Sequence, residues 1–211
     1  IFCLPQPQRE NIKMPFHSEE SALKCLTLAA LLGLPHPSIA EVATPGNYRI
    51  DPGHSTVLFS IGHLGTSELT GRFNDIEGSF LLGKGQLPRL DVTIKTASVD
   101  TNHDKRDAHL RSPDFFNVKQ YPVMRFSADN VSYNKQGQPT TLHGKLTLHG
   151  KTKPVAFVIS PVGAGKDPWG GYRAGFNAST TLKRSEFGMN FMPGGIGEEV
   201  TVTLNIEATK Q

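Results

Sequence analysis

Eight segments of the chain alternate apolar and polar residues with a period of two. In residues 199–209, for example, Val202 and Leu204 share one side of an extended chain, whereas Thr201 and Thr203 take the other. This alternation indicates strands with one buried and one exposed face, which are typical of antiparallel sheets. The predicted strands cover residues 55–64, 72–82, 89–99, 122–133, 141–149, 153–162, 172–183 and 199–209.

The predicted fold class is therefore all-β, with two architectures open. Eight antiparallel strands close into a barrel that has room for side chains or one small ligand. The same strands also build a two-sheet sandwich. The 21 glycines and 15 prolines among 211 residues suit a fold with many turns. After Tyr48 the sequence contains no helical pattern longer than about 10 residues.

Residues 100–116 interrupt the alternation with a polar insert that is rich in charge and histidine. Residues 104–111 predict about two helical turns, in which Asp107 and Arg111 have the spacing of an i,i+4 pair. A helix-start signal at Ser112 begins a second short turn that carries two phenylalanines into the sheet. We expect this short helical insert to lie between the fourth and fifth strands.

The N-terminal part predicts a targeting segment rather than a piece of the fold. A 10-residue apolar run, Cys25–Leu34, precedes small residues that end at Ala40, as in a cleaved secretory signal. We expect residues 1–40 to be a signal peptide with an over-extended start, cut after Ala40, and residues 41–211 to be one exported domain. A soluble N-terminal helix is the alternative.

Three further features of the sequence limit the bonds and partners that we expect for the domain. Both cysteines, Cys3 and Cys25, precede the predicted cut, so the mature chain is expected to have no thiol and no disulfide. No apolar run reaches the ~20 residues that a membrane-spanning helix needs. A net charge of +3 without a basic, aromatic-interleaved run argues against a nucleic-acid partner.

The histidines and acids do not form a recognisable metal or catalytic motif. His143 and His149 are six residues apart on one predicted strand, which separates them by roughly 20 Å. Arg106, Asp107 and His109 have the chemistry of a general acid–base site, yet no nucleophile motif accompanies them. We interpret Asp107 and Arg111 as a pair that locks the helix, with one of the two tying it to the strands, and we expect no metal, no cofactor and no enzymatic activity.

The apolar faces of the strands leave binding as the remaining function. Burial of apolar surface contributes ~25 cal/mol per Å², so a long apolar molecule inside a barrel gains of order 10 kcal/mol before costs. The alternative is that the same side chains fill a solid core.

Several ordered motifs resemble those of a known family. They include the run Arg106-Asp107-x-His109-Leu110-x-Ser112 and the run Leu146-Thr147-Leu148-x-Gly150-x-Thr152-Lys153-Pro154-Val155. From Tyr48 to Ala208 the chain resembles the YceI-like, or polyisoprenoid-binding, family of bacterial periplasmic proteins. His149 departs from the asparagine that is usual there, and the Gly-x-Trp start of lipocalins is absent.

The resemblance implies an eight-stranded antiparallel lipocalin-like β-barrel without an established enzymatic activity. It also implies that the lumen holds a long isoprenoid chain, such as a polyprenyl phosphate or a quinone tail. In some members a fatty acid or fatty amide takes that place. A stress-related protein that binds such a fatty molecule, and an enzyme that acts on a lipid head group, are the alternatives.

We therefore hypothesise a periplasmic lipid carrier that does not span the membrane, and the sequence leaves a homodimer open. The apolar residues expected to line or approach the lumen are Phe59, Ile61, Phe73, Phe80, Ile94, Phe126, Leu146, Leu148, Phe157, Phe176, Val202 and Leu204. The polar residues expected at one mouth, where an arginine would bind a head group bidentately, are His103, Arg106, His109 and Arg111.

Overall fold

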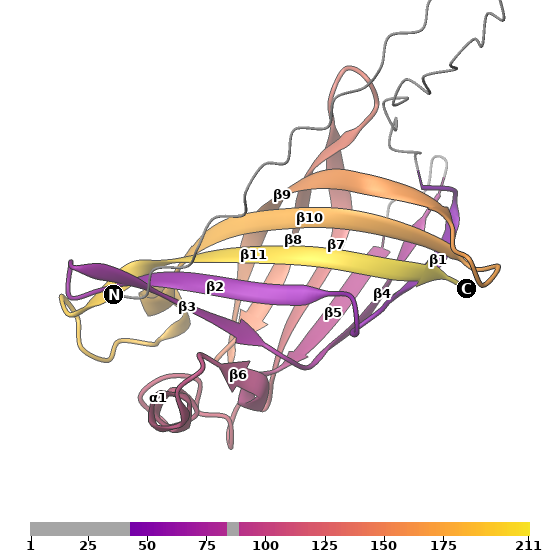
Figure 1. Ribbon diagram of the computed structural model, residues 1–211. Helices are drawn as coiled ribbons and strands as arrows, with labels where there is room; N and C mark the ends of the chain where they lie inside the picture. The colour runs from indigo at the N-terminus through magenta and orange to yellow at the C-terminus, as the bar shows by residue number, and fades with distance from the viewer. Residues whose placement is uncertain (1–42, 84–88) are drawn as a thin grey trace, which may run out of the picture. The chain divides into compact units, whose positions relative to one another are not determined.

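The computed structural model describes residues 43–83 and 89–211, which form a β-barrel with one short α-helix (Figure 1). The predicted cut after Ala40 lies outside the described residues. The strands are β1 (Gly46–Ile50), β2 (Thr56–His63), β3 (Ser67–Phe73), β4 (Ile76–Leu82), β5 (Arg89–Lys95), β6 (Val99–Asp100), β7 (Val123–Tyr133), β8 (Pro139–Leu148), β9 (Lys151–Lys166), β10 (Tyr172–Lys183) and β11 (Ile196–Lys210). The helices are α1 (Asp104–Leu110) and the two 3₁₀ turns η1 (Thr96–Ser98) and η2 (Arg184–Phe187).

The barrel closes because β1 pairs with both β4 and β11. Eight antiparallel strands follow one another around the ring, in the order β1-β4-β5-β7-β8-β9-β10-β11. Strands β2, β3 and β6 branch from β11, which pairs with β1 near Ala208 and with β2 at Val202. The closed antiparallel barrel is confirmed, and the two-sheet sandwich is wrong.

All eight predicted segments contain a strand, and three further strands were missed. The predicted strand 72–82 combines the end of β3 with β4. In the structure these strands are separated at Asn74, whose backbone N–H donates to the carbonyl of Ser98. Strand β3 reads Ser-Glu-Leu-Thr-Gly-Arg-Phe, which has too few apolar residues for the alternation to stand out. Strands β1 and β6 have five and two residues, which is too short for a periodic signal.

The predicted helical insert is confirmed as α1, which follows β6 and precedes β7. It therefore lies between the third and fourth of the eight predicted segments, not between the fourth and fifth. None of the helices in the described ranges is long and apolar enough to cross a membrane.

Side-chain hydrogen bonds fasten α1 to the chain that precedes it. The buried carboxylate of Asp107 accepts from the backbone N–H of Thr101 at 2.9 Å and from its hydroxyl at 2.5 Å. Arg111 donates to the carbonyls of Ala97 and Val99 at 2.8 and 2.6 Å. The predicted Asp107–Arg111 pair is thus replaced by two separate ties. Asp107 holds the helix to Thr101, directly after β6, and Arg111 holds the end of the helix to η1 and β6.

Candidate functional site

The interior of the barrel is a cavity of about 1640 Å³. Protein interiors normally contain few voids larger than a water molecule, and typical small-molecule pockets measure roughly 300–1,000 Å³. Its lining is predominantly apolar and comes from the inward faces of the strands. The barrel is therefore hollow, and the solid-core alternative does not hold.

All twelve apolar residues predicted for the lumen line this cavity; they are Phe59, Ile61, Phe73, Phe80, Ile94, Phe126, Leu146, Leu148, Phe157, Phe176, Val202 and Leu204. Arg106 and His109 line it as well. That any of them contacts a ligand stays a prediction.

Two of the predicted mouth residues have structural contacts instead. His103 is the N-cap of α1, where its Nδ1 accepts from the backbone N–H of Arg106 at 3.2 Å. Arg111 is held by the carbonyls of Ala97 and Val99, as described above. Neither residue is part of the cavity lining, and a contact of either one with a head group stays a prediction.

The acidic, basic and histidine side chains of the lining gather at the end of the barrel next to α1, which we call the α1 end. They are His63, Glu68, Arg106, His109 and Arg184. Thr101 positions Arg106, because its hydroxyl accepts from Nε and its carbonyl from Nη2, both at 2.7 Å. The same hydroxyl donates a hydrogen bond to the carboxylate of Asp107.

Three rings pack together at the α1 end. The centroid of His109 lies 5.0 Å from Phe115 and 5.0 Å from Phe191, and those two phenylalanines are 5.3 Å apart. His109 Nε2 also lies 2.8 Å from a carboxylate oxygen of Asp114. The insert's other phenylalanine, Phe116, packs edge-on against Phe73 at 5.3 Å. Both phenylalanines of the insert line the cavity, as the sequence predicts.

The opposite end of the cavity is neutral. None of the lining residues at this end in the described ranges is charged; they are Ala43, Thr44, Pro45, Leu82, Gly83, Val131, Tyr133, Asn134, Gln136, Gly137, Gln138, Pro139, Thr140, Ser160, Pro161 and Gly163. Phe80 contributes an aromatic wall, stacked on buried Tyr48 at 5.1 Å and edge-on to Phe176 at 5.7 Å. Asn134 closes the β7–β8 turn by accepting from the backbone N–H groups of Gln136 and Gln138. One end of the lumen thus suits a polar or charged group, and the other suits hydrocarbon.

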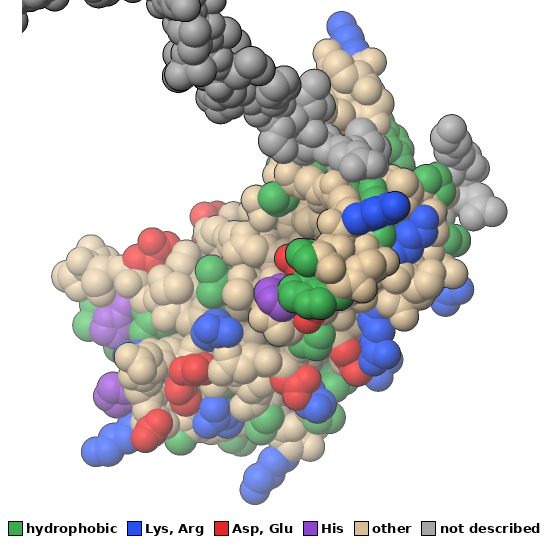
Figure 2. Space-filling model, turned by 45° about the vertical axis from the view of Figure 1, so that its right-hand side comes forward, with side chains coloured by type: hydrophobic (Ala, Val, Ile, Leu, Met, Phe, Trp, Pro, Cys, Tyr) green, Lys and Arg blue, Asp and Glu red, His purple; other side chains and the backbone are tan. Residues whose placement is uncertain are grey.

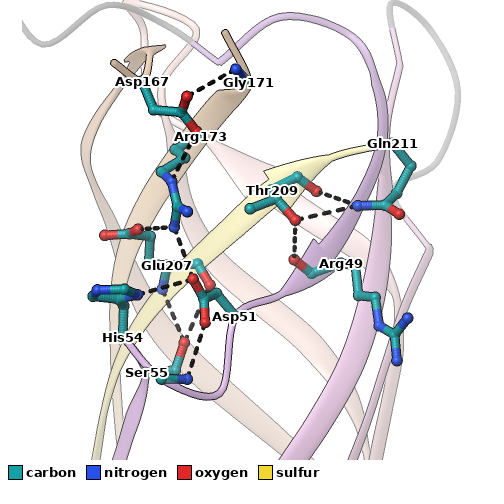
Figure 3. A network of polar contacts seen from close by, with 11 residues as sticks. Arg49, Asp51, His54, Ser55, Asp167, Gly171, Arg173, Glu207, Thr209 and Gln211 are labelled. Atoms are coloured by element: carbon teal, nitrogen blue, oxygen red, sulfur yellow. Dashed lines mark hydrogen bonds and ion pairs between the residues drawn. The ribbon is translucent and has the colours of Figure 1, made fainter. Parts of the chain in front are cut away.

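A second polar cluster lies outside the lumen and acts as a clamp (Figure 3). Arg173 on β10 binds Asp51, Asp167 and Glu207, with Asp51 Oδ2 at 2.7 Å. The hydrogen bond from Arg173, followed by that from His54, lowers the pKa of Asp51 to about 2. A backbone hydrogen bond from Gly171 is the largest cause of the lowered pKa of Asp167.

Asp51, His54 and Glu207 are close enough to one another to ligate a cation. However, the guanidinium of Arg173 already contacts both carboxylates. Through Arg173 the cluster joins the β1–β2 connection to β10 and β11. Sequence reasoning missed it as a unit because its members come from separate segments. Figure 2 shows positive and negative side chains mixed over one face of the molecule.

Sequence reasoning also missed part of the α1 end. Phe191 and Met192 line the cavity from the segment between η2 and β11, as does Arg184 of η2. A loop has no periodicity, so only the exceptional apolar content of residues 187–192 could have drawn attention to it.

Known proteins match this chain over most of its length. The family model of the YceI-like domain matches residues 48–208. A UPF0312 protein of Pseudomonas aeruginosa is 44% identical over 189 residues, which covers 88% of this chain and 98% of the relative. Protein YceI of Escherichia coli is 41% identical over 189 residues, with 86% and 98% covered.

Solved structures share the fold. Burkholderia cenocepacia BcnA superposes with a TM-score of 0.68 at 20% identity and covers 76% of this chain and 99% of its own. A polyisoprenoid-binding domain from Saccharophagus degradans gives 0.60 at 15% identity, with 78% and 98% covered. The matched family model spans nearly all of the described barrel, and the chain belongs to the YceI-like family.

Proposed function

We propose that this protein is a periplasmic carrier that holds one long isoprenoid lipid in the barrel lumen. The observation that carries the proposal is the hollow, apolar cavity of about 1640 Å³ whose acidic, basic and histidine lining residues lie at one end. The structural neighbour from S. degradans, described as a polyisoprenoid-binding domain, supports the same ligand class. Export through cleavage after Ala40 is part of this proposal.

The polarity of the lumen suggests one orientation of the ligand. The hydrocarbon chain lies along the apolar walls toward the neutral end, where burial of its surface provides the binding energy. The head group lies at the α1 end, within reach of Arg106 and His109. A phosphate there would accept charge-assisted hydrogen bonds from the guanidinium. A quinone would accept weaker ones.

A lipid-modifying enzyme fits the site less well. The acid–base trio considered from the sequence is split, because Asp107 is buried against Thr101 and is not part of the cavity lining. Arg106 and His109 remain, and both suit the binding of a polar head group. Binding of a lipid requires no acid–base residues, so the arrangement of Arg106 and His109 fits a carrier better than an enzyme.

The test is to purify the protein from its native host and identify bound molecules by native mass spectrometry. We expect an isoprenoid lipid, and delipidated protein should gain thermal stability when a polyprenyl phosphate or a quinone is added. Recovery of a fatty acid or fatty amide would support the alternative ligand class. Empty protein that takes up none of these lipids would remove the carrier function. Light scattering of the same sample distinguishes a monomer from the homodimer that the sequence leaves open.

A pair of variants tests whether the lumen is the site. Ala178 on β10 lines the cavity, so Ala178→Trp should fill part of the lumen and reduce uptake. Ala156 on β9 is exposed on the outside, and Ala156→Trp is the matched control that should bind normally. Equal uptake by both variants would place the ligand elsewhere.

A further inference from the structure

The α1 end carries an exposed apolar surface that the proposed function does not explain. Leu64, Phe191 and Met192 are 52%, 37% and 45% exposed. The β2–β3 turn that carries Leu64 is tied to the η2–β11 loop, because the Leu64 N–H donates to the carbonyl of Gly195 at 2.7 Å. The Met192 side chain lies directly over Gly195. We call these three side chains the apolar tip.

The apolar tip is continuous with the lumen. Phe191 and Met192 are exposed to solvent and also line the cavity. The Phe191 ring packs against Phe115, which is buried and lines the cavity as well. Apolar surface therefore runs without interruption from the outside of the protein into its interior.

The backbone at the tip does not favour apolar side chains. The φ angles of Leu64 and Gly65 are 53° and 67°, and the Thr66 N–H donates back to the carbonyl of His63. Turns with two positive φ angles strongly prefer Asn-Gly or Asp-Gly. Met192, with a φ of 49°, is a second apolar residue in the left-handed region. Asparagine would fit both positions better, which indicates a function for the apolar groups rather than for the turns.

The loop that carries Phe191 and Met192 has a rigid base. Arg184 is only 4% exposed and donates to the carbonyls of Met189, Ile196 and Gly197. One guanidinium thus holds both ends of the loop. A loop that is already ordered loses little conformational entropy when it binds a surface.

We propose that the apolar tip docks on a lipid bilayer, so that the lipid passes between membrane and lumen without crossing water. This inference rests on the proposed function. A bilayer is the occupant that fits, because it is the environment from which a long isoprenoid enters such a path and because apolar side chains insert into its interface. The charged lining residues at this end are Glu68 and two arginines, Arg106 and Arg184, whose guanidiniums already donate to backbone carbonyls. We therefore expect the attraction to be mainly apolar and to depend little on lipid charge or salt.

The experiment measures co-flotation of the full chain with vesicles of phosphatidylcholine alone and with added phosphatidylglycerol, at low and high salt. We expect binding to both vesicles. Leu64→Asn should leave the melting temperature unchanged or higher and should lower the vesicle-bound fraction about fivefold. Adding Met192→Asn should lower it further. Val158→Thr, which removes an exposed apolar group from the outer face of β9, is the control that binds like the wild type.

A second variant probes the opposite end. Trp169, on the turn between β9 and β10, is 83% exposed. Trp169→Asn should leave vesicle binding unchanged. Loss of binding in this variant with normal binding by Leu64→Asn would overturn the proposal, as would binding that occurs with anionic vesicles only. A shift in the oligomeric state of Leu64→Asn without any vesicle binding by the wild type would instead assign the tip to a second copy of the chain.

Supplying the lipid in two ways, from cyclodextrin and from vesicles, distinguishes a failure of docking from a failure of the proposed function. With a prenyl lipid supplied from cyclodextrin, Leu64→Asn should bind with wild-type affinity, because Leu64 is not part of the cavity lining. With the same lipid supplied from vesicles, its uptake should be about fivefold slower. Equal uptake rates from vesicles would overturn docking alone. Absence of uptake by the wild type from cyclodextrin would overturn the proposed function. The co-flotation experiment would still test docking, because it does not depend on uptake of the lipid.

Discussion

Thr101 shows how one residue organises the polar end of the lumen. Its hydroxyl donates to Asp107 and accepts from Arg106 Nε, and its carbonyl accepts from Arg106 Nη2. A buried carboxylate therefore orients a cavity-lining guanidinium through a shared hydroxyl. Such a chain is sensitive to each of its members, because a buried donor that loses its partner keeps its full desolvation cost.

Asp107→Ala should destabilise the protein by about 3 kcal/mol, because the N–H and hydroxyl of Thr101 would both lose a charged acceptor. Urea unfolding followed by circular dichroism measures the change. Asp104→Ala, in the exposed first turn of α1, is the control and should cost only a few tenths of a kcal/mol. Equal effects of the two variants would mean that the Asp107 contacts contribute little.

Arg106→Gln should weaken binding of a polyprenyl phosphate about tenfold, because one charge-assisted hydrogen bond to the head group is lost. The matching polyprenyl alcohol should bind nearly as well as it does to the wild type, since its chain makes the same apolar contacts. Isothermal titration with both lipids measures the difference. A loss that is equal for phosphate and alcohol would show that the head group does not lie beside Arg106.

Residues on periodic strands could be assigned to the lumen from the sequence, whereas residues of loops and caps could not. Phe126 and Val202 reveal their inward direction by alternation alone. His103 and Arg111 occur in the polar insert beside Arg106, yet backbone carbonyls and the helix start determine where they point. Phe191 has no periodic neighbours, so its place at the α1 end follows from the tertiary fold only.

At the scale of elements, the Arg173 clamp holds together parts of the chain that are distant in sequence. Asp51 follows β1, while Arg173 and Glu207 belong to β10 and β11. Because Asp51 has a lower pKa in the folded protein than in the unfolded chain, it contributes stability above pH ~4. That contribution is lost as the pH falls from about 4 toward 2.

Arg173→Met should therefore reduce the free energy of unfolding at neutral pH and flatten its decline between pH ~4 and 2. We expect Asp51 to account for of order 1 kcal/mol of this, because the side chains are partly exposed. Chemical unfolding at a series of pH values tests it. Lys95→Met, which breaks an exposed pair with Asp75, is the control and should leave the acid-dependent slope almost unchanged. An unaltered slope in Arg173→Met would contradict the role of the clamp.

Long elements could be predicted better than short ones for a physical reason. Strand β11 has 15 residues, and the alternation of apolar and polar residues along it identifies both of its faces. Strand β3 is largely polar, so its place is determined by backbone pairing with β2 and β6 rather than by its own hydrophobic pattern. The break between β3 and β4 depends on a hydrogen bond from Asn74 to Ser98, a partner 24 positions away in sequence.

For the whole molecule, the sequence could predict a closed sheet with an apolar interior but not its volume. Whether Phe157 and Leu204 meet across the interior or leave a space depends on the diameter of the ring, which pairing around all eight strands determines. The part of β10 that lines the cavity runs from Gly175 to Leu182, which is roughly 23 Å at ~3.3 Å per residue. The lumen is thus long as well as wide, and its length limits the chain that it can enclose.

Affinity should therefore rise with the number of isoprene units and then level off once the lumen is full. Each added unit buries more apolar surface, at ~25 cal/mol per Å², until the chain reaches the neutral end. A titration series of polyprenyl phosphates of increasing length measures this. Ala178→Trp should move the plateau to shorter chains because it shortens the free lumen, and Ala156→Trp should leave the plateau where it is in the wild type. Affinity that is independent of chain length would mean that the hydrocarbon does not occupy the barrel.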